Sequence, residues 1–150
     1  MTDTARSPFR QSTSLEALNA QSRGTAMEPL GIVFTEIGAD YLRATMPVDA
    51  RTRQPYGLLH GGASVLLAET LGSTGGMLCA EPGRGVVGIE INANHLRGVR
   101  EGTVTGTARP LHVGRSTQVW DIRIEDEAGR AVCVSRLTVA VIDLPKPDAP

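Results

Sequence analysis

The feature that most constrains this chain is a segment at about residues 61–79 that is apolar on nearly every side and carries one charged residue, Glu69. Its composition predicts an α-helix that ends at Glu81-Pro82-Gly83. A helix that is apolar all round is buried inside a protein and not laid on its surface. The rest of the chain must therefore supply a layer that covers this helix.

Strand-like segments on both sides of the helix can provide that layer. A short helix ending at about Ser22 comes first, with Thr13 and Glu16 at capping-box spacing. The last strand-like segment is apolar on both faces, which indicates a central strand with something packed on each side. We predict an α+β architecture, one antiparallel sheet with a single long helix. The six expected strands are residues 30–37, 41–46, 86–96, 102–111, 116–125 and 131–142.

The length of 150 residues suits one domain with one core. We expect a disordered N-terminus at residues 1–12 and a single domain at residues 13–143. Residues 144–150 hold three prolines, and we expect them to form a flexible tail.

Charge and hydropathy exclude several classes of partner. The net charge of −1 leaves no basic excess for a nucleic-acid backbone. The longest apolar stretch, residues 63–80, is interrupted by polar residues and glycines and is too polar to span a membrane. No apolar stretch follows the first charges, so we expect no signal peptide. Two lone cysteines, Cys79 and Cys133, make no disulfide framework, and we expect a cytoplasmic protein.

Three signals resemble motifs but lack the context that the motifs need. Residues 83–88 match a dinucleotide-binding glycine pattern, yet here a helix precedes them and a strand follows, so we interpret them as a helix-to-strand turn. Ser64 lacks the second glycine of a nucleophile elbow, and we interpret it as a helix-start residue. His60, His95 and His112 have no ligand spacing. We therefore expect neither a metal nor a cofactor.

Glu69 is the residue most suited to chemistry. A carboxylate in apolar surroundings costs several kcal/mol unless it is paired or its pKa shifts. No Arg or Lys lies within one turn of it on the helix. One interpretation is a salt bridge to an arginine from a strand. The other is a desolvated carboxylate that acts as a base or nucleophile.

His60-Gly61-Gly62 at the helix start provides a second element. Unpaired backbone amides point outward there, and glycines leave them open to a ligand oxygen. The sequence could equally be an ordinary glycine-rich helix entry. Glu69 follows Gly61 by eight residues, or roughly 12 Å along a helix. One chain cannot easily aim both groups at the same carbonyl, so we expect a composite site with groups from two subunits.

Residues 53–64 together with Leu67-Ala68-Glu69 closely resemble the hotdog-fold thioesterases of 4-hydroxybenzoyl-CoA and 1,4-dihydroxy-2-naphthoyl-CoA. Residues 88–95 and 111–117 are also similar to that family. The resemblance covers about residues 15–142 and implies a hotdog fold, in which the sheet wraps around the long helix. It implies an acyl-CoA thioesterase that works as a homo-oligomer, with a dimer of dimers expected and the active site at the subunit interface.

The resemblance also implies roles for individual residues. Glu69 matches the nucleophile or general base, and the Gly61 amide polarises the thioester carbonyl. Gln54 and His60 orient the carbonyl and support the helix start, and Ser73 helps to handle water. Contacts to the CoA phosphates and adenosine are expected from Arg97, Arg115, Ser116 and Thr117.

Two other functions remain open at this point. A hotdog dehydratase or hydratase would use a histidine and an acid, which His60 and Glu69 could imitate. A non-catalytic acyl-CoA-binding module would need no buried carboxylate, and Glu69 argues against it. The acyl group itself is not readable from the residues, and only the resemblance favours an aryl or naphthoyl group.

Overall fold

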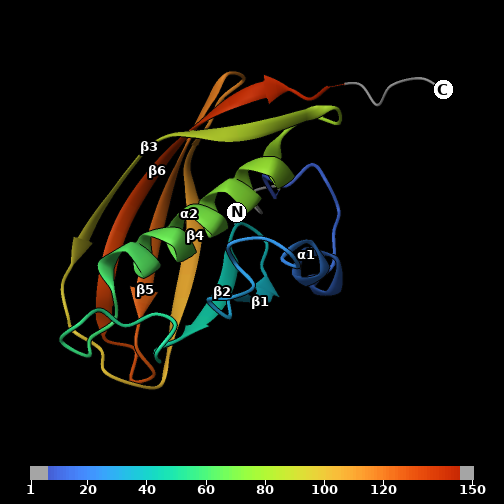
Figure 1. Ribbon diagram of the computed structural model, residues 1–150. Helices are drawn as coiled ribbons and strands as arrows, with labels where there is room; N and C mark the ends of the chain where they lie inside the picture. The colour runs from blue at the N-terminus through green and yellow to red at the C-terminus, as the bar shows by residue number, and fades with distance from the viewer. Residues whose placement is uncertain (1–6, 146–150) are drawn as a thin grey trace, which may run out of the picture.

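The computed structural model describes residues 7–145. Six antiparallel strands form one sheet in the order β1-β2-β4-β5-β6-β3, and the long helix α2 lies along one face of it (Figure 1). The elements are α1 (Leu15–Gln21), β1 (Val33–Ile37), β2 (Leu42–Pro47), α2 (Gly61–Cys79), β3 (Arg84–His95), β4 (Thr103–Val113), β5 (Thr117–Glu125) and β6 (Ala131–Asp143). This confirms the predicted hotdog fold, with the sheet curled around the helix.

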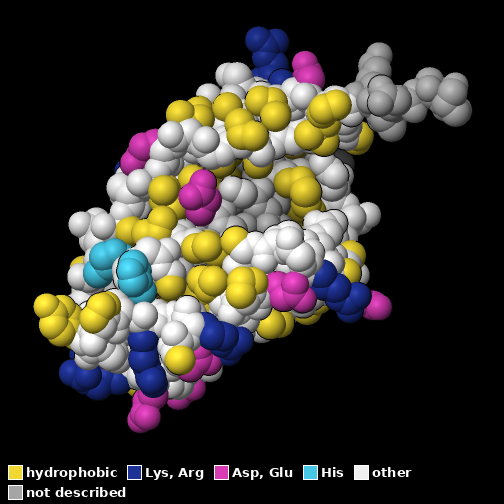
Figure 2. All heavy atoms as spheres, in the orientation of Figure 1, with side chains coloured by type: hydrophobic (Ala, Val, Ile, Leu, Met, Phe, Trp, Pro, Cys, Tyr) yellow, Lys and Arg dark blue, Asp and Glu magenta, His cyan; other side chains and the backbone are white. Residues whose placement is uncertain are grey.

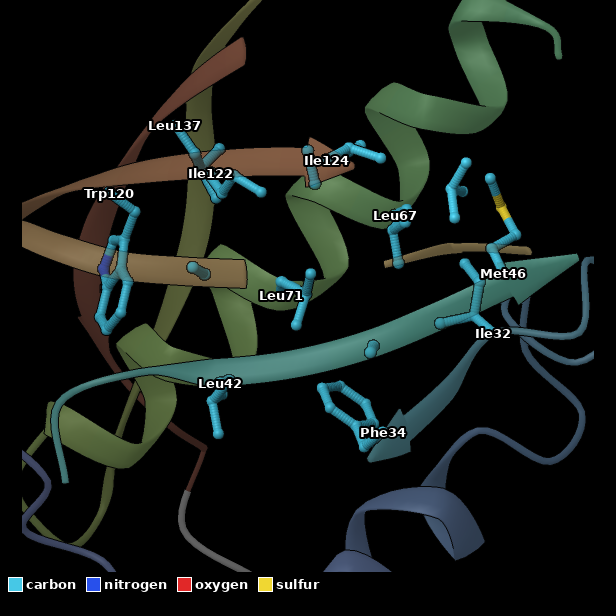
Figure 3. Close-up of a cluster of buried hydrophobic side chains, with 14 of the residues drawn as sticks. Ile32, Phe34, Leu42, Met46, Leu67, Leu71, Trp120, Ile122, Ile124 and Leu137 are labelled. Carbon is cyan, nitrogen blue, oxygen red and sulfur yellow. The ribbon is translucent and has the colours of Figure 1, made fainter. Parts of the chain in front are cut away.

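The core lies between α2 and the sheet. Leu67 and Leu71 of α2 are fully buried, and they point towards side chains of β2 and β5 (Figure 3). Along β2 and β5 every second residue is buried, as expected for strands with one face on a helix. The strand residues labelled in the figure are Phe34, Leu42, Met46, Trp120, Ile122, Ile124 and Leu137.

Glycines allow α2 to approach the sheet closely. A Cβ added at Gly72 would lie 2.6 Å from Leu137 Cδ2. At this distance a side chain at residue 72 would force either Leu137 or the helix to move, so glycine is the residue that fits here without adjustment. The helix thus accepts glycines, which are intrinsically unfavourable in helices, in exchange for contact with the strands.

The strand β6 lies inside the sheet, between β5 and β3, as its apolar pattern predicted. Its inward residues, such as Leu137 and Val139, are fully buried. Val134 and Thr138 on the outer face stay partly exposed, and no element among the described residues covers them. The second packing layer that the sequence predicted is therefore not found in the described part of the chain.

The N-terminal segment differs from its predicted disorder over the residues that the structure describes. The backbone amides of Arg10 and Gln11 donate to Leu78 O at 2.8 and 3.0 Å, and Gln11 Nε2 donates to Met77 O and Ala80 O. These donors satisfy carbonyls at the C-terminal end of α2, which have no partner within the helix. Residues 1–6 and 146–150 lie outside the described range, so the remaining expectations for both ends are untested.

Some predicted boundaries also change. Ser14, and not Thr13, caps α1, because its side chain accepts a hydrogen bond from Ala17 N. The strand β3 starts at Arg84, so most of the glycine run 83–88 lies in the strand, and only Gly83, with φ at +83°, makes the turn. β1 begins at Val33, later than predicted, after Gly31 with φ at +68°.

Asn19 attaches α1 to the edge of the sheet. Its side-chain amide donates to Phe34 O at 3.0 Å and accepts from Phe34 N at 2.8 Å. The amide thus pairs with β1 as another strand would. This contact fixes the ends of the turn-rich segment 22–31, which runs from α1 to β1 and faces α2.

Candidate active site

Glu69 lies in the middle of α2, above the edge strand β3. The side chain is half-buried, and a Cβ added at Gly88 would collide with Glu69 Oε1. The pairing of β3 with β6 shifts between Gly88 and Glu90, which marks a β-bulge at this point. Bulges are common beside active sites, where they redirect a strand. Here Gly88 provides the space in which the carboxylate rests.

The Glu69 carboxylate has neither a cationic partner nor a hydrogen bond among the residues that the structure describes. The salt-bridge interpretation of Glu69 therefore finds no support. The carboxylate opens into a cleft of about 370 Å³ between α2 and the segment 22–31. Its walls are Thr25, Ala26, Met27, Leu66, Thr70, Ser73 and Thr74, so Ser73 lies in the same cleft as Glu69.

The start of α2 presents one open backbone amide. His60 is the N-cap, and its Nδ1 accepts a hydrogen bond from Gly62 N at 2.9 Å. His60 O accepts from the amides of Ala63 and Ser64. Within the described residues the Gly61 N–H has no such partner, which leaves it free to meet a ligand oxygen.

Gln54 reaches the same place from the preceding loop. Its backbone N–H donates to Leu58 O at 2.8 Å and its carbonyl accepts from Gly57 N at 2.9 Å, so the loop is tight. Its side-chain Oε1 accepts from Tyr56 N. Gln54 and Gly61 both line a second cleft of about 330 Å³.

The predicted catalytic residues are thus divided between two clefts. Glu69 and Ser73 line one, and Gln54 and Gly61 line the other. His60 lines neither of them, and it holds the helix start by its cap. The described part of one chain does not bring the carboxylate and the open amide together.

Sequence reasoning did not identify Gly88 as the neighbour of Glu69 or His95 as the neighbour of Gly61. A Cβ added at Gly61 would lie 2.7 Å from His95 Nε2, so the imidazole stands directly beside the open amide. In the sequence His95 is noted as a rejected metal ligand and within the family-like stretch 88–95, with no role assigned to it at the helix start. Its position depends on the pairing of β3 with β6 and on the packing of α2, which local patterns do not specify.

The predicted CoA contacts are also separated. Exposed Arg97 lines the cleft with Gln54 and Gly61. Arg115 and Ser116 lie in another hollow, next to Arg84, and Thr117 begins β5. Arg84, which sequence reasoning did not single out, is ion-paired with Asp143 and donates to Arg115 O at 3.1 Å.

Other features of the described residues limit the chemistry. Nowhere in residues 7–145 do three or more His, Cys, Asp or Glu side chains gather in a way that could hold a metal ion. Neither α1 nor α2 has the length and apolar character required to cross a membrane. Both cysteines are free and buried, and burial raises the pKa of the Cys79 thiol to about 11.

Comparison with known proteins gives one consistent result. A family model described as the thioesterase superfamily matches residues 56–133. The chain is 57% identical over 134 residues to a 1,4-dihydroxy-2-naphthoyl-CoA hydrolase of Escherichia coli, which covers 89% of this chain and 98% of that protein. The proofreading thioesterase EntH of Cronobacter sakazakii matches with the same identity and coverage.

Solved structures agree with the sequence comparison. The crystal structure of a thioesterase of Haemophilus influenzae superimposes with a TM-score of 0.90 at 51% identity, covering 94% of this chain and 99% of that one. A mutant thioesterase of Pseudomonas aeruginosa also gives a TM-score of 0.90 at 51% identity, with coverage of 92% and 100%.

Proposed function

The chain belongs to the thioesterase superfamily and is a thioester hydrolase, and we propose that it hydrolyses an aryl-, naphthoyl- or fatty-acyl-CoA thioester to the free acid and CoA. The observation that carries this proposal is the position of Glu69. Its carboxylate opens into a cleft, above a glycine, without a cation that would hold it among the described residues. Such a group can attack a carbonyl carbon or take a proton from water.

In the proposed reaction the carbonyl oxygen accepts a hydrogen bond from Gly61 N–H and is oriented by Gln54. Negative charge that develops on this oxygen is stabilised there by the amide and by the dipole of α2. Glu69 either attacks the carbonyl carbon, giving an anhydride that water cleaves, or activates water to attack it. In both routes the C–S bond breaks and CoA leaves as a thiol. Ser73, one turn from Glu69, helps to place the water.

We propose that the two halves of this site come from different subunits. Two observations support a homo-oligomer. Within residues 7–145 the strand β3 forms an unpaired edge of the sheet, with Val87 and Ile89 exposed at 47% and 62%, and Figure 2 shows hydrophobic side chains gathered along this side of the molecule. An exposed apolar edge strand is a surface that pairs with another chain. A second copy at β3 would bring its own helix start towards Glu69.

The uncovered outer face of the sheet supports a further contact, so that a dimer of dimers results. For substrate binding we propose that Arg97, Arg115, Ser116 and Thr117 contact the phosphates and adenosine of CoA. Arg97 and Arg115 lie in separate hollows, which suits a long ligand that crosses from one subunit to the next.

We also propose a cytoplasmic location, where free thiols such as Cys79 and Cys133 are usual.

For the acyl group we propose an aryl or naphthoyl ring. The Glu69 cleft has apolar walls from Leu66 and Met27 and hydroxyl groups from Thr70 and Thr74. A flat ring with polar substituents fits such a lining. The relative named a 1,4-dihydroxy-2-naphthoyl-CoA hydrolase supports the same choice. The dehydratase alternative is weakened because His60 Nδ1 is engaged by Gly62 N in the cap of α2 and the His60 ring lines neither cleft.

Replacing Glu69→Gln tests this proposal. The amide keeps the size of the side chain but cannot act as a base or an oxyanion nucleophile, so we expect the release of free CoA thiol from a panel of aryl- and alkyl-CoA esters to fall by about 10³-fold or more. Binding of CoA, measured by calorimetry, should be retained. The matched control is Glu16→Gln, an exposed glutamate on α1 that lies away from β3 and from both clefts. Near-normal turnover of the Glu69→Gln variant would refute the role of Glu69.

A further inference from the structure

Ser64 carries an unexplained polar group. It is 1% exposed, and its Oγ is the one buried side-chain oxygen or nitrogen in the described residues without a hydrogen-bond partner. A buried hydroxyl that lacks a partner is costly, because it has lost its hydrogen bonds to water and gained none. Alanine would be the better residue in a helix. The serine is therefore retained at a cost to the free chain.

The place of Ser64 indicates what the hydroxyl is for. It lies three residues after Gly61 in α2 and lines the cleft that Gly61 and Gln54 share. Helical side chains lean towards the N-terminus of their helix, so Ser64 covers the turn that contains Gly61. The unpartnered hydroxyl thus belongs to the end of the cleft where the open amide lies.

The Gln54 side chain also lacks a hydrogen-bond partner, at its Nε2 donor. Its Oε1 accepts a hydrogen bond from Tyr56 N, whereas its Nε2 donates to no acceptor in the described part of the chain. Gln54 is only half-buried, on a loop rather than on the helix. Gln54 and Ser64 line the same cleft, so rotation of the Gln54 side chain can turn its Nε2 donors towards Ser64. A serine oxygen is able to accept one of those donors while its own proton points elsewhere.

We propose that Ser64 is a positioning residue for the thioester carbonyl: its hydroxyl accepts a hydrogen bond from Gln54 Nε2 when substrate fills the cleft, and so directs the other Nε2 hydrogen at the carbonyl oxygen beside the Gly61 amide. This inference rests on the proposed function of Gln54. It explains why the hydroxyl is unpaired in the free chain. It also assigns a role to a serine whose surrounding sequence excludes a nucleophile.

A second buried serine provides a matched comparison. Ser135 on β6 is 2% exposed, lines neither cleft, and donates to Asn92 O at 2.8 Å. Its hydrogen bond is complete within the chain, so its loss should reduce stability and leave the carbonyl end of the site unchanged. Ser64→Ala should behave in the opposite way, because no bond is lost in the free protein.

The experiment measures the melting temperature, kcat and KM, with an aryl-CoA ester that the wild type hydrolyses as the substrate. The variants are Ser64→Ala, Ser64→Cys, Ser135→Ala, Gln54→Ala and the Ser64→Ala/Gln54→Ala double variant. We expect Ser64→Ala to melt at or above the wild-type temperature while kcat falls about tenfold with little change in KM, because the donor that Ser64 directs strengthens its hydrogen bond as negative charge develops on the carbonyl oxygen. Ser64→Cys, which keeps the volume but is a weak acceptor, should lose activity similarly. Ser135→Ala should melt lower with unchanged kcat.

The double variant decides whether Ser64 acts through Gln54. We expect Ser64→Ala to cause no further loss once Gln54 is alanine. Wild-type kcat in Ser64→Ala, or a tenfold loss that persists in the Gln54→Ala background, would overturn the inference while leaving the proposed function intact. Wild-type kcat in Gln54→Ala itself would instead refute the proposed carbonyl site, and the inference with it.

Discussion

Glu69 and Gly88 form a pair that neither residue explains alone. The carboxylate occupies the space that a side chain at residue 88 would take. The bulge in β3 begins at the same residue, which aligns the strand below the helix. The position of the reacting oxygen is therefore set by the absence of a Cβ as much as by the helix that carries Glu69.

Gly88→Ala tests this arrangement at the level of one atom. No positive φ is required at Gly88, so alanine is compatible with the backbone. The added methyl should push the Glu69 carboxylate away, and we expect kcat to fall by at least tenfold while the melting temperature changes by only a few degrees. In a Glu69→Gln background the same change should have no further effect on kcat. A Gly88→Ala variant with wild-type kcat would contradict the account of this pair.

Residues of the site differ in how far the sequence alone reveals them. Glu69 could be found because it is the single charge in an apolar helix, and Gly61 because glycines at a helix start expose amides. Gly88 and His95 could not, since each matters only through a contact with α2 made across the fold. Ser64 could be placed on the helix, but its missing hydrogen bond is visible only in three dimensions.

The helix α2 was also the element that the sequence predicted best. Its predicted bounds agree with the observed Gly61–Cys79, because His60-Gly61-Gly62 marks its start and Glu81-Pro82-Gly83 marks its end. The strand ends were predicted less well, since turns such as the one at Gly31 depend on backbone angles. The order of the N-terminal segment was missed because its partners are carbonyls of α2 that are far away in sequence.

The cap of α2 gives a prediction at the scale of the element. His60→Ala removes the acceptor of the Gly62 amide, and we expect the free energy of unfolding to fall by about 1 kcal/mol. His60→Asn supplies a short side-chain oxygen as the cap and should restore most of that stability. Denaturant unfolding of both variants measures the difference. If asparagine were as destabilising as alanine, the cap would not be the structural role of His60.

At the scale of the whole molecule, the fold separates the Glu69 carboxylate from the Gly61 amide and leaves an edge strand at which a second subunit could bring them together. The clefts of Glu69 and Gly61 are separate within the described chain. The free edge of β3 extends along both of these clefts, from Gly88 beneath Glu69 to His95 beside Gly61. A two-fold contact between two β3 strands would therefore place each Glu69 near the helix start of the other subunit.

The most direct measurement of this claim mixes two impaired variants, Glu69→Gln and Gln54→Ala, each lacking one half of the site, after unfolding and refolding them together in equal amounts. With shared sites, half of the dimers are mixed and one of their two sites is fully native, so the mixture should recover about one quarter of the wild-type kcat per subunit. Refolding each variant alone is the control. A mixture no more active than the average of the separate variants would contradict the composite site.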